Sequence, residues 1–197
     1  MQYFDSLPKV IKTKDGISIL MTDLMARCSI IPEILRDPML YYEYTIQDGD
    51  TPEIVAYKYY GDSYRYWIVL FANQITDPQW DWPLSSNDFD AYISDKYQTF
   101  NPYSTIHHYE KIITQYDAVT QTTTTKNIII DEETYNSLVT GTNTYTLPTG
   151  NVTVTVSKAA VSFYDYELNL NESKRTINIL NVNYVDQLEE QFKELMV

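Results

Sequence analysis

The sequence predicts an α+β fold: a small strand–helix–helix–strand core with an N-terminal arm, a β-rich insertion and a C-terminal helix. Residues 44–78 run through a β-branched strand, a turn and two helix patterns. Residues 100–161 are rich in Thr, Tyr, Val and Ile and lose helical periodicity. The final segment repeats apolar residues at the spacing of an amphipathic helix. Helical and strand patterns are therefore segregated along the chain, which is typical of α+β proteins.

The core begins with a short strand at residues 44–46, followed by a turn in which Gly49 can adopt a positive φ. Asp50 and Glu53 have the spacing of a capping box, and Gly61 is typical of a residue that ends a helix. The next helix begins at Asp62 or Ser63 and carries an apolar stripe, in which we expect Trp67 to be buried: Tyr64, Trp67, Ile68 and Phe71.

The core lacks a closing strand immediately after its second helix. Residues 79–83 form a poor strand because Pro78 directly precedes them and Pro83 ends them. We therefore expect residues 175–180 to supply the missing strand and to pair with residues 42–46. This pairing divides the chain into an arm (1–40), a core (41–84), a helix with a β-rich insertion (85–170), and a closing strand with an amphipathic helix (171–197).

The arm and the insertion are predicted from local signals. In the arm, Thr22 begins a short helix that extends to Cys28, and Pro32 begins another turn. The arm docks either on its own core or on a neighbouring subunit, and the sequence leaves both open. The insertion contains a helix from Ser85 or Ser86 to about Gln98. Strands are expected at residues 112–119, 126–130, 152–156 and 164–170, with a hairpin tip or a flexible loop at 120–125 and a short helix from Asp131 to Leu138.

Composition excludes several functional classes. The formal net charge is −13 without a basic cluster, so a nucleic-acid backbone would be repelled. The apolar run at residues 17–35 is interrupted by charges and Pro32, so no membrane-spanning helix is expected. Cys28 is the single cysteine, which rules out a disulfide within the chain.

No catalytic, cofactor-binding or metal-ligating residues are predicted. His107 and His108 are the only histidines, and neighbours on a strand point to opposite faces, which makes a poor metal pair. Asp77 and Asp81 lie in a loop without the rigid frame that a glycosidase requires. Asp48 and Asp50 lack the later ligands of a calcium loop.

Tyrosine is abundant, with 19 residues, and tyrosine suits protein–protein contacts because it joins apolar area to one hydrogen bond. The tryptophans of residues 79–83 form either a lid over the core or a contact surface. Similarly, the stripe of the last helix, which Asn183 caps with Asp186 as partner, covers the sheet or contacts a partner. The candidate contact residues are Tyr64, Tyr66, Trp80, Trp82, Val185, Leu188, Phe192 and Leu195.

The core resembles the LysM module, a small β-α-α-β fold. The residues that carry this resemblance are Tyr44-Thr45-Ile46, Gly49-Asp50-Thr51, Val55-Ala56, Tyr59, Gly61 and Asn73. A longer resemblance is to the LysM-like baseplate wedge subunits of T4-like contractile-tailed bacteriophages. It rests on Tyr60-Gly61-Asp62, Tyr66-Trp67, Asn73, Asp77-Pro78, residues 163–170, Lys174-Arg175-Thr176-Ile177 and the closing helix.

The resemblance implies a non-enzymatic structural protein of the virion, in the tail baseplate, assembled in the host bacterial cytoplasm. Its implied partners are other baseplate wedge proteins and the tail hub and tube, with neighbouring copies arranged around a sixfold ring. The alternative that a LysM module implies is binding of peptidoglycan or another N-acetylglucosamine polymer. That groove would lie between residues 48–52 and 74–77.

Overall fold

The computed structural model describes residues 3–14, 16–26, 28–30, 37–148 and 150–196. These residues have the α+β composition that the sequence predicts, with helices and three separate antiparallel sheets. The helices, including the 3₁₀ turns η1 to η3, are η1 (Tyr3–Ser6), α2 (Pro52–Tyr60), η2 (Ser63–Arg65), α3 (Tyr66–Ala72), α4 (Pro78–Asp81), α5 (Ser86–Lys96), α6 (Glu132–Ser137), α7 (Phe163–Ser173), η3 (Val182–Tyr184) and α8 (Val185–Leu195). The strands are β1 (Lys9–Lys14), β2 (Ile17–Thr22), β3 (Tyr41–Thr45), β4 (Ile106–Asp117), β5 (Thr122–Ile130), β6 (Gly141–Leu147), β7 (Gly150–Ser162) and β8 (Thr176–Leu180).

The chain folds into two compact units. Unit 1 comprises residues 1–87 and 171–197, and unit 2 comprises residues 88–170. The chain therefore passes from one unit to the other twice.

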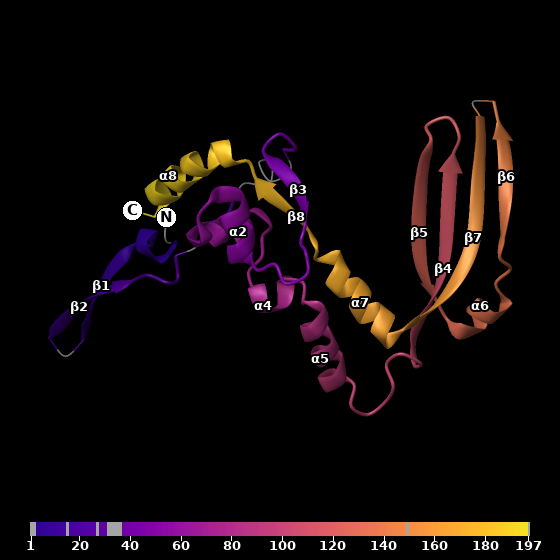
Figure 1. Ribbon diagram of the computed structural model, residues 1–197, viewed down its shortest axis with the longest axis horizontal. Coiled ribbons are helices and arrows are strands. Elements are labelled where there is room, and N and C mark those ends of the chain that lie inside the picture. The colour runs from indigo at the N-terminus through magenta and orange to yellow at the C-terminus, as the bar shows by residue number, and fades with distance from the viewer. Residues whose placement is uncertain (1–2, 15, 27, 31–36, 149, 197) are drawn as a thin grey trace. The chain divides into compact units, whose positions relative to one another are not determined.

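Unit 1 is organised around the antiparallel pairing of β3 with β8, which lie side by side in Figure 1. The register runs from Tyr41 opposite Leu180 to Thr45 opposite Thr176, and the Ile46 N–H donates to Arg175 O at 2.8 Å. This confirms the pairing expected from the missing strand of the core. The alternate residues Ile177 and Ile179 of β8 are buried, as a half-buried strand requires.

The other edge of β8 is occupied by the side chain of Asn73, which follows α3. Its Nδ2 donates to Asn178 O at 2.8 Å, and its Oδ1 accepts from Asn178 N at 2.8 Å. Nδ2 also donates to Val69 O at 2.8 Å. One amide thus ties the end of α3 to the backbone of β8, in the way that a neighbouring strand would.

The helix α2 begins one residue later than the capping box predicts. Thr51 is the N-cap and accepts a hydrogen bond from Ile54 N at 3.4 Å, so Asp50 is not the cap. Gly61 ends the helix with φ 68°, and its N–H donates to Tyr57 O at 3.0 Å, as expected for a left-handed C-terminal residue. Asp62 then caps η2 through Tyr64 N.

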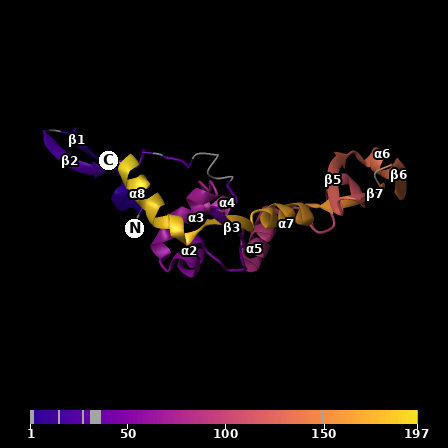
Figure 2. The same ribbon diagram turned by 90° about the horizontal axis from the view of Figure 1, so that it is seen from above.

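The core of unit 1 is formed by buried residues of α2, α3, β8 and α8, and α8 lies beside α3 in Figure 2. Phe192 and Trp67 are buried, with their rings 4.9 Å apart, and Tyr3 of η1 contacts both. The predicted cap of α8 is wrong. Asn181 caps the preceding turn η3, and Tyr184 precedes α8 without a side-chain hydrogen bond.

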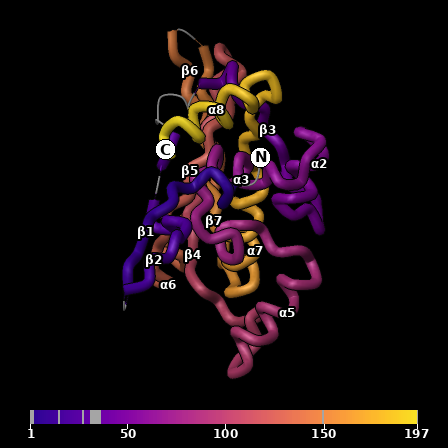
Figure 3. Tube along the Cα trace, turned by 90° about the vertical axis from the view of Figure 1, so that its left-hand side faces the viewer, coloured from indigo at the N-terminus to yellow at the C-terminus, as the bar shows by residue number. Residues whose placement is uncertain are grey.

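The arm contains a β-hairpin instead of the predicted helix. The strands β1 and β2 pair without interruption from Lys9 opposite Thr22 to Lys14 opposite Ile17, and Figure 3 shows them side by side. Thr22 is therefore the last residue of a strand and not a helix cap. The turn predicted at Pro32 lies outside the described residues.

Unit 2 contains a four-stranded antiparallel sheet in the order β5-β4-β7-β6 (Figure 1). Three of the four predicted strands, 112–119, 126–130 and 152–156, correspond to β4, β5 and β7, which are longer, whereas β6 was not predicted. Of the two alternatives for residues 120–125, the structure has the hairpin tip, but the tip is shorter than predicted, because Thr122 and Thr125 already pair with Asp117 and Thr114. Asp131 caps α6 through Thr134 N at 2.8 Å.

Residues 164–170 belong to the helix α7, so the predicted strand at this place is wrong. The sequence alternates Tyr and Leu with acidic residues and asparagine, which is a strand pattern. The helix instead buries Glu167 and Asn171, which lie four residues apart on one face. Because these buried side chains are polar, the spacing of apolar residues in the sequence did not indicate a helix.

Candidate interaction surfaces

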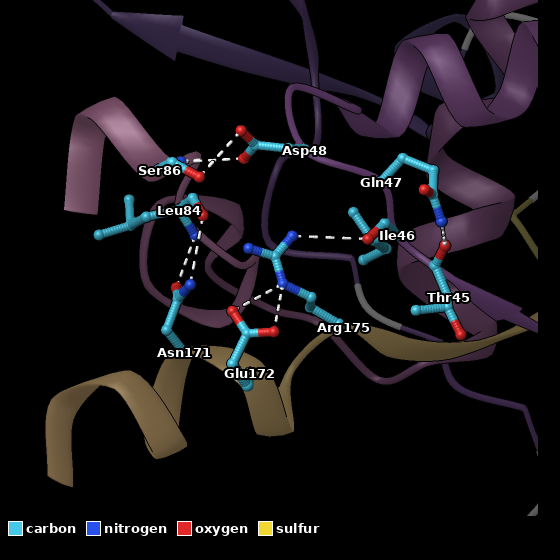
Figure 4. A network of polar contacts seen from close by, with 9 residues as sticks. All are labelled: Thr45, Ile46, Gln47, Asp48, Leu84, Ser86, Asn171, Glu172 and Arg175. Atoms are coloured by element: carbon cyan, nitrogen blue, oxygen red, sulfur yellow. Dashed lines mark hydrogen bonds and ion pairs between the residues drawn. The ribbon is translucent and has the colours of Figure 1, made fainter. Parts of the chain in front are cut away.

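A polar network closes unit 1 where the chain leaves for unit 2 and returns from it (Figure 4). Leu84 N donates to Asn171 Oδ1 at 2.7 Å, and Asn171 Nδ2 donates to Leu84 O at 3.2 Å. Ser86 donates from N and Oγ to the Asp48 carboxylate at 2.9 and 3.0 Å. The outgoing and returning segments are therefore held together by reciprocal hydrogen bonds, and the outgoing one is fixed to the turn after β3.

Two cations extend this network. Arg175 Nε donates to both oxygens of Glu172 at 2.8 and 2.7 Å, and an Arg175 terminal nitrogen reaches Ile46 O at 3.5 Å. Lys174 Nζ donates to Trp80 O. These contacts fix the entry to β8, so the network positions the strand that completes the core.

The two tryptophans of the predicted lid differ in exposure. Trp82 is 8% exposed and its Nε1 donates to Asp50 O at 2.8 Å, whereas the side chain of Trp80 is 65% exposed. Trp82 is thus a lid on the core, and Trp80 remains available to a partner.

Asp50 holds the turn under this lid. Its carboxylate accepts from the Tyr44 hydroxyl and from Lys58 Nζ at 2.6 Å. Burial raises the pKa of Asp50, but the hydrogen bonds from Lys58 and Tyr44 outweigh this and leave the pKa below its ordinary value. The carboxylate therefore stays charged and keeps the turn closed.

The other candidate contact residues of unit 1 also divide between core and surface. Val185 and Phe192 are buried, and Tyr66 is partly buried against the core. Tyr64 is exposed. The residue between the two tyrosines in the sequence, Arg65, donates from Nε to Glu189 of α8 at 3.0 Å. The remaining two, Leu188 and Leu195, line an apolar groove of about 340 Å³ together with Cys28, Leu40, Phe71 and Phe192.

The hairpin β1–β2 is the surface that sequence reasoning missed. Six of its twelve strand residues are large apolar side chains that are exposed: Val10, Ile11, Ile17, Ile19, Leu20 and Met21. Ile11 and Leu20 are 72% and 65% exposed and oppose each other on one face. The available signal was Asp15-Gly16 between two β-prone runs, which is typical of a tight hairpin turn.

Unit 2 contains an ion pair between a buried carboxylate and a partly exposed lysine. Glu167 of α7 is 7% exposed and accepts from Lys96 Nζ at 2.7 Å, Tyr97 OH at 2.6 Å and Tyr92 OH at 3.3 Å. Burial raises the pKa of Glu167, but these donors, Lys96 first, lower it below its ordinary value. The pair fastens α7 to α5.

The histidines are not arranged as expected for neighbours on a regular strand. Their Nδ1 atoms lie 2.8 Å apart, because the register of β4 shifts between Ile106 and His108. His107 also stacks on Tyr166 with ring centroids 4.1 Å apart, so packing accounts for its position. Burial raises the pKa of the Cys28 thiol, which lowers its reactivity.

Two other kinds of site are absent from the described residues. No group of three or more His, Cys, Asp or Glu there is placed to hold a metal ion. Likewise, none of the helices in that part of the chain has the length and apolar character needed to cross a bilayer.

Comparison with known proteins identifies the family. The model of the family described as base plate wedge protein 53 matches residues 3–195. No curated protein matches the chain. The matched segment includes the hairpin, both units and α8, so the whole architecture described above falls within it. The chain therefore belongs to the base plate wedge protein 53 family, whose members are structural proteins of the phage tail baseplate.

Proposed function

We propose that this protein joins neighbouring wedge subunits of the baseplate around the tail hub, as a clamp without catalytic activity. The observation that carries this proposal is the hairpin β1–β2 with its six exposed apolar side chains. An isolated two-stranded hairpin is marginally stable in water, so one with apolar residues on both faces gains stability by docking.

The charges of the hairpin indicate the chemistry of the docking surface. Lys9, Lys12 and Lys14 lie on β1, and neither strand contains an acidic residue. The surface that receives the hairpin is therefore apolar with an acidic rim. A stable contact of this kind would bury about 1,200–2,000 Å² in total, of which the hairpin supplies the apolar centre.

The proposal includes a LysM-like core, supported by the order β3, α2, α3, β8 and the pairing of its two strands. Further parts of it are a sixfold arrangement of copies, contact with the hub and tube, and assembly in the host cytoplasm. In the core, Tyr64 and Trp80 are the proposed partner contacts, because both are exposed.

The test is co-purification with the other wedge proteins of the same phage, co-expressed with a tagged full-length chain. We expect Ile11→Asp/Leu20→Asp to reduce co-purification at least tenfold, because it places two charges in the apolar centre of the contact. The matched control is Thr13→Asp/Ser18→Asp, which adds the same charges to the next opposed pair on the same face, where the wild-type side chains are polar.

Two results would overturn the proposal. One is a wild-type chain that binds none of the co-expressed wedge proteins. The other is equal loss of binding in both double variants, which would assign the effect to charge alone and not to the apolar surface.

Binding of N-acetylglucosamine polymers is disfavoured by contacts within the chain. The turn that would form one wall of the sugar groove is covered by Trp82 on Asp50 and held by Ser86 on Asp48. Calorimetric titration of the full chain with chito-oligomers should give no saturable heat. Saturable binding would restore this function.

A further inference from the structure

The strand β6 forms an open edge of the sheet in unit 2. It lies at the end of the order β5-β4-β7-β6, beside β7, and all seven of its residues are exposed. Its sequence, GTNTYTL, contains no charged residue and no proline. An edge of this kind leaves a row of backbone donors and acceptors without strand partners.

Most other edges in the described chain carry a device that blocks strand addition. β1 contains three lysines, β3 contains Glu43, and β5 contains Lys126. Asn73 engages the edge of β8. β2 also lacks charge, but it belongs to a two-stranded hairpin.

The edge β6 is also held in position for pairing. Its register with β7 runs without a bulge from Gly141 opposite Val156 to Leu147 opposite Gly150. Side-chain hydrogen bonds join Thr142 to Thr155 at 3.0 Å and Thr144 to Thr153 at 3.3 Å. Because the strand is already ordered, adding another strand costs less conformational entropy than it would at a flexible edge.

The sequence of β6 is self-complementary about its central residue, Thr144. In an antiparallel pair of two copies centred there, Thr144 opposes Thr144 and Thr142 opposes Thr146, while Asn143 opposes Tyr145. Threonine pairs across antiparallel strands are favourable, and no like charges are brought together at the seam. All three threonine rows then lie on one face, as the period of a strand requires.

We propose that two copies of this chain pair through β6, antiparallel and centred on Thr144, to form one eight-stranded sheet. A second copy fits because an isologous contact requires a self-complementary surface, and the uncharged, symmetric threonine pattern of β6 provides one. The contact lies in unit 2, whereas the clamp function is carried by the hairpin of unit 1. Because the pair has a twofold axis, it is a contact of the free chain and not one between neighbours of the sixfold ring.

Sedimentation velocity of the full-length chain tests the proposal across a concentration series. We expect a species of twice the 23.0 kDa of one chain to increase with concentration. Thr144→Lys and Thr144→Glu should each weaken the dimer at least tenfold, because like charges then face each other directly. An equimolar mixture of the two variants should restore the dimer, since lysine then faces glutamate.

The matched control is Thr123→Lys. Thr123 lies on β5, at the opposite edge of the sheet. It belongs to the same cross-strand row as Thr144, because Thr144 opposes Thr153, Thr153 opposes Tyr116, and Tyr116 opposes Thr123. It should leave the dimer unchanged. A wild-type chain that stays monomeric at all concentrations would overturn the proposal, as would variant mixtures that remain monomeric although circular dichroism shows both variants folded.

Discussion

The carboxylate of Glu167 stays charged inside unit 2 because three donors surround it. Lys96 and Tyr97 lie within 2.7 Å of the same oxygen, and Tyr92 reaches the other at 3.3 Å. A buried charge without such partners would favour neutralisation. The stability that the network contributes therefore depends on pH.

Replacement of this side chain should change both stability and its pH dependence. The pKa of Glu167 lies below its ordinary value of 4.5, so its stabilising effect is complete above pH 4.5 and declines as the pH falls through the lowered value. Glu167→Gln should lower the free energy of unfolding by about 1–3 kcal/mol at pH 7, because the charged hydrogen bonds are lost. The loss is not larger because Lys96 is partly exposed and can be solvated by water. The substitution should also make the urea midpoint less sensitive to pH below 4.5, where the wild-type carboxylate becomes protonated.

The exposed Glu133 of α6 provides the control, because Glu133→Gln should change the free energy of unfolding by less than about 0.5 kcal/mol. If the variant Glu167→Gln kept the full acid sensitivity of the wild type, the pH dependence would have to arise elsewhere.

Residues with one dominant local role were predictable, and residues with competing roles were not. Gly61 was predicted to end α2 because only a left-handed residue suits that place, and its φ is 68°. Thr51 and Asp50 both have capping side chains, and the choice between them depends on Lys58 and Tyr44, which hold Asp50 in the turn. These contacts join the turn to β3 and α2, so no pattern of neighbouring residues indicates them.

At the scale of elements, an apolar pattern identifies a helix or strand only when apolar side chains cover its buried face. In α8 two of the three buried residues, Val185 and Phe192, are apolar, and the third, Glu189, is bonded to Arg65. In α7 the buried residues are the polar Glu167 and Asn171, so the apolar pattern marks α8 but not α7. The strands of the hairpin β1–β2 were not identified for a different reason. Its apolar residues lie on both faces, so neither strand alternates cleanly between apolar and polar.

The stripe of α8 should divide into a structural part and a surface part. Phe192→Ala should cost about 3–5 kcal/mol, because the ring is buried against Trp67, Phe71 and Tyr3. Leu195→Ala should cost less than about 0.5 kcal/mol, because that side chain is 71% exposed. Urea unfolding monitored by tryptophan fluorescence measures both. Equal costs would contradict the placement of the core.

At the scale of the molecule, the pairing of β3 with β8 was predictable because the core sequence lacks a strand that the closing segment supplies. The interaction surface of the hairpin was not, because exposure is a property of the folded chain. The candidate contacts accordingly mixed buried residues such as Trp82 with exposed ones such as Trp80.

Unit 1 should fold without unit 2. Replacement of residues 88–170 by a flexible linker of about eight residues keeps the loop-closure cost low. The bonds between Leu84 and Asn171 already hold the two joined ends together. We expect a cooperative unfolding transition and amide exchange protection in β3 and β8. A shortened chain without protected amides would show that unit 1 requires unit 2.

The pairing of β3 with β8 has a consequence for integrity under proteolysis. The two strands lie on opposite sides of residues 88–170 in the sequence, yet they share one sheet. A single cleavage in a loop of unit 2 therefore yields two fragments on a denaturing gel. Under native conditions the fragments stay together, because one carries β3 and the other carries β8. Damage to the inserted sheet would leave the scaffold that supports it in one piece.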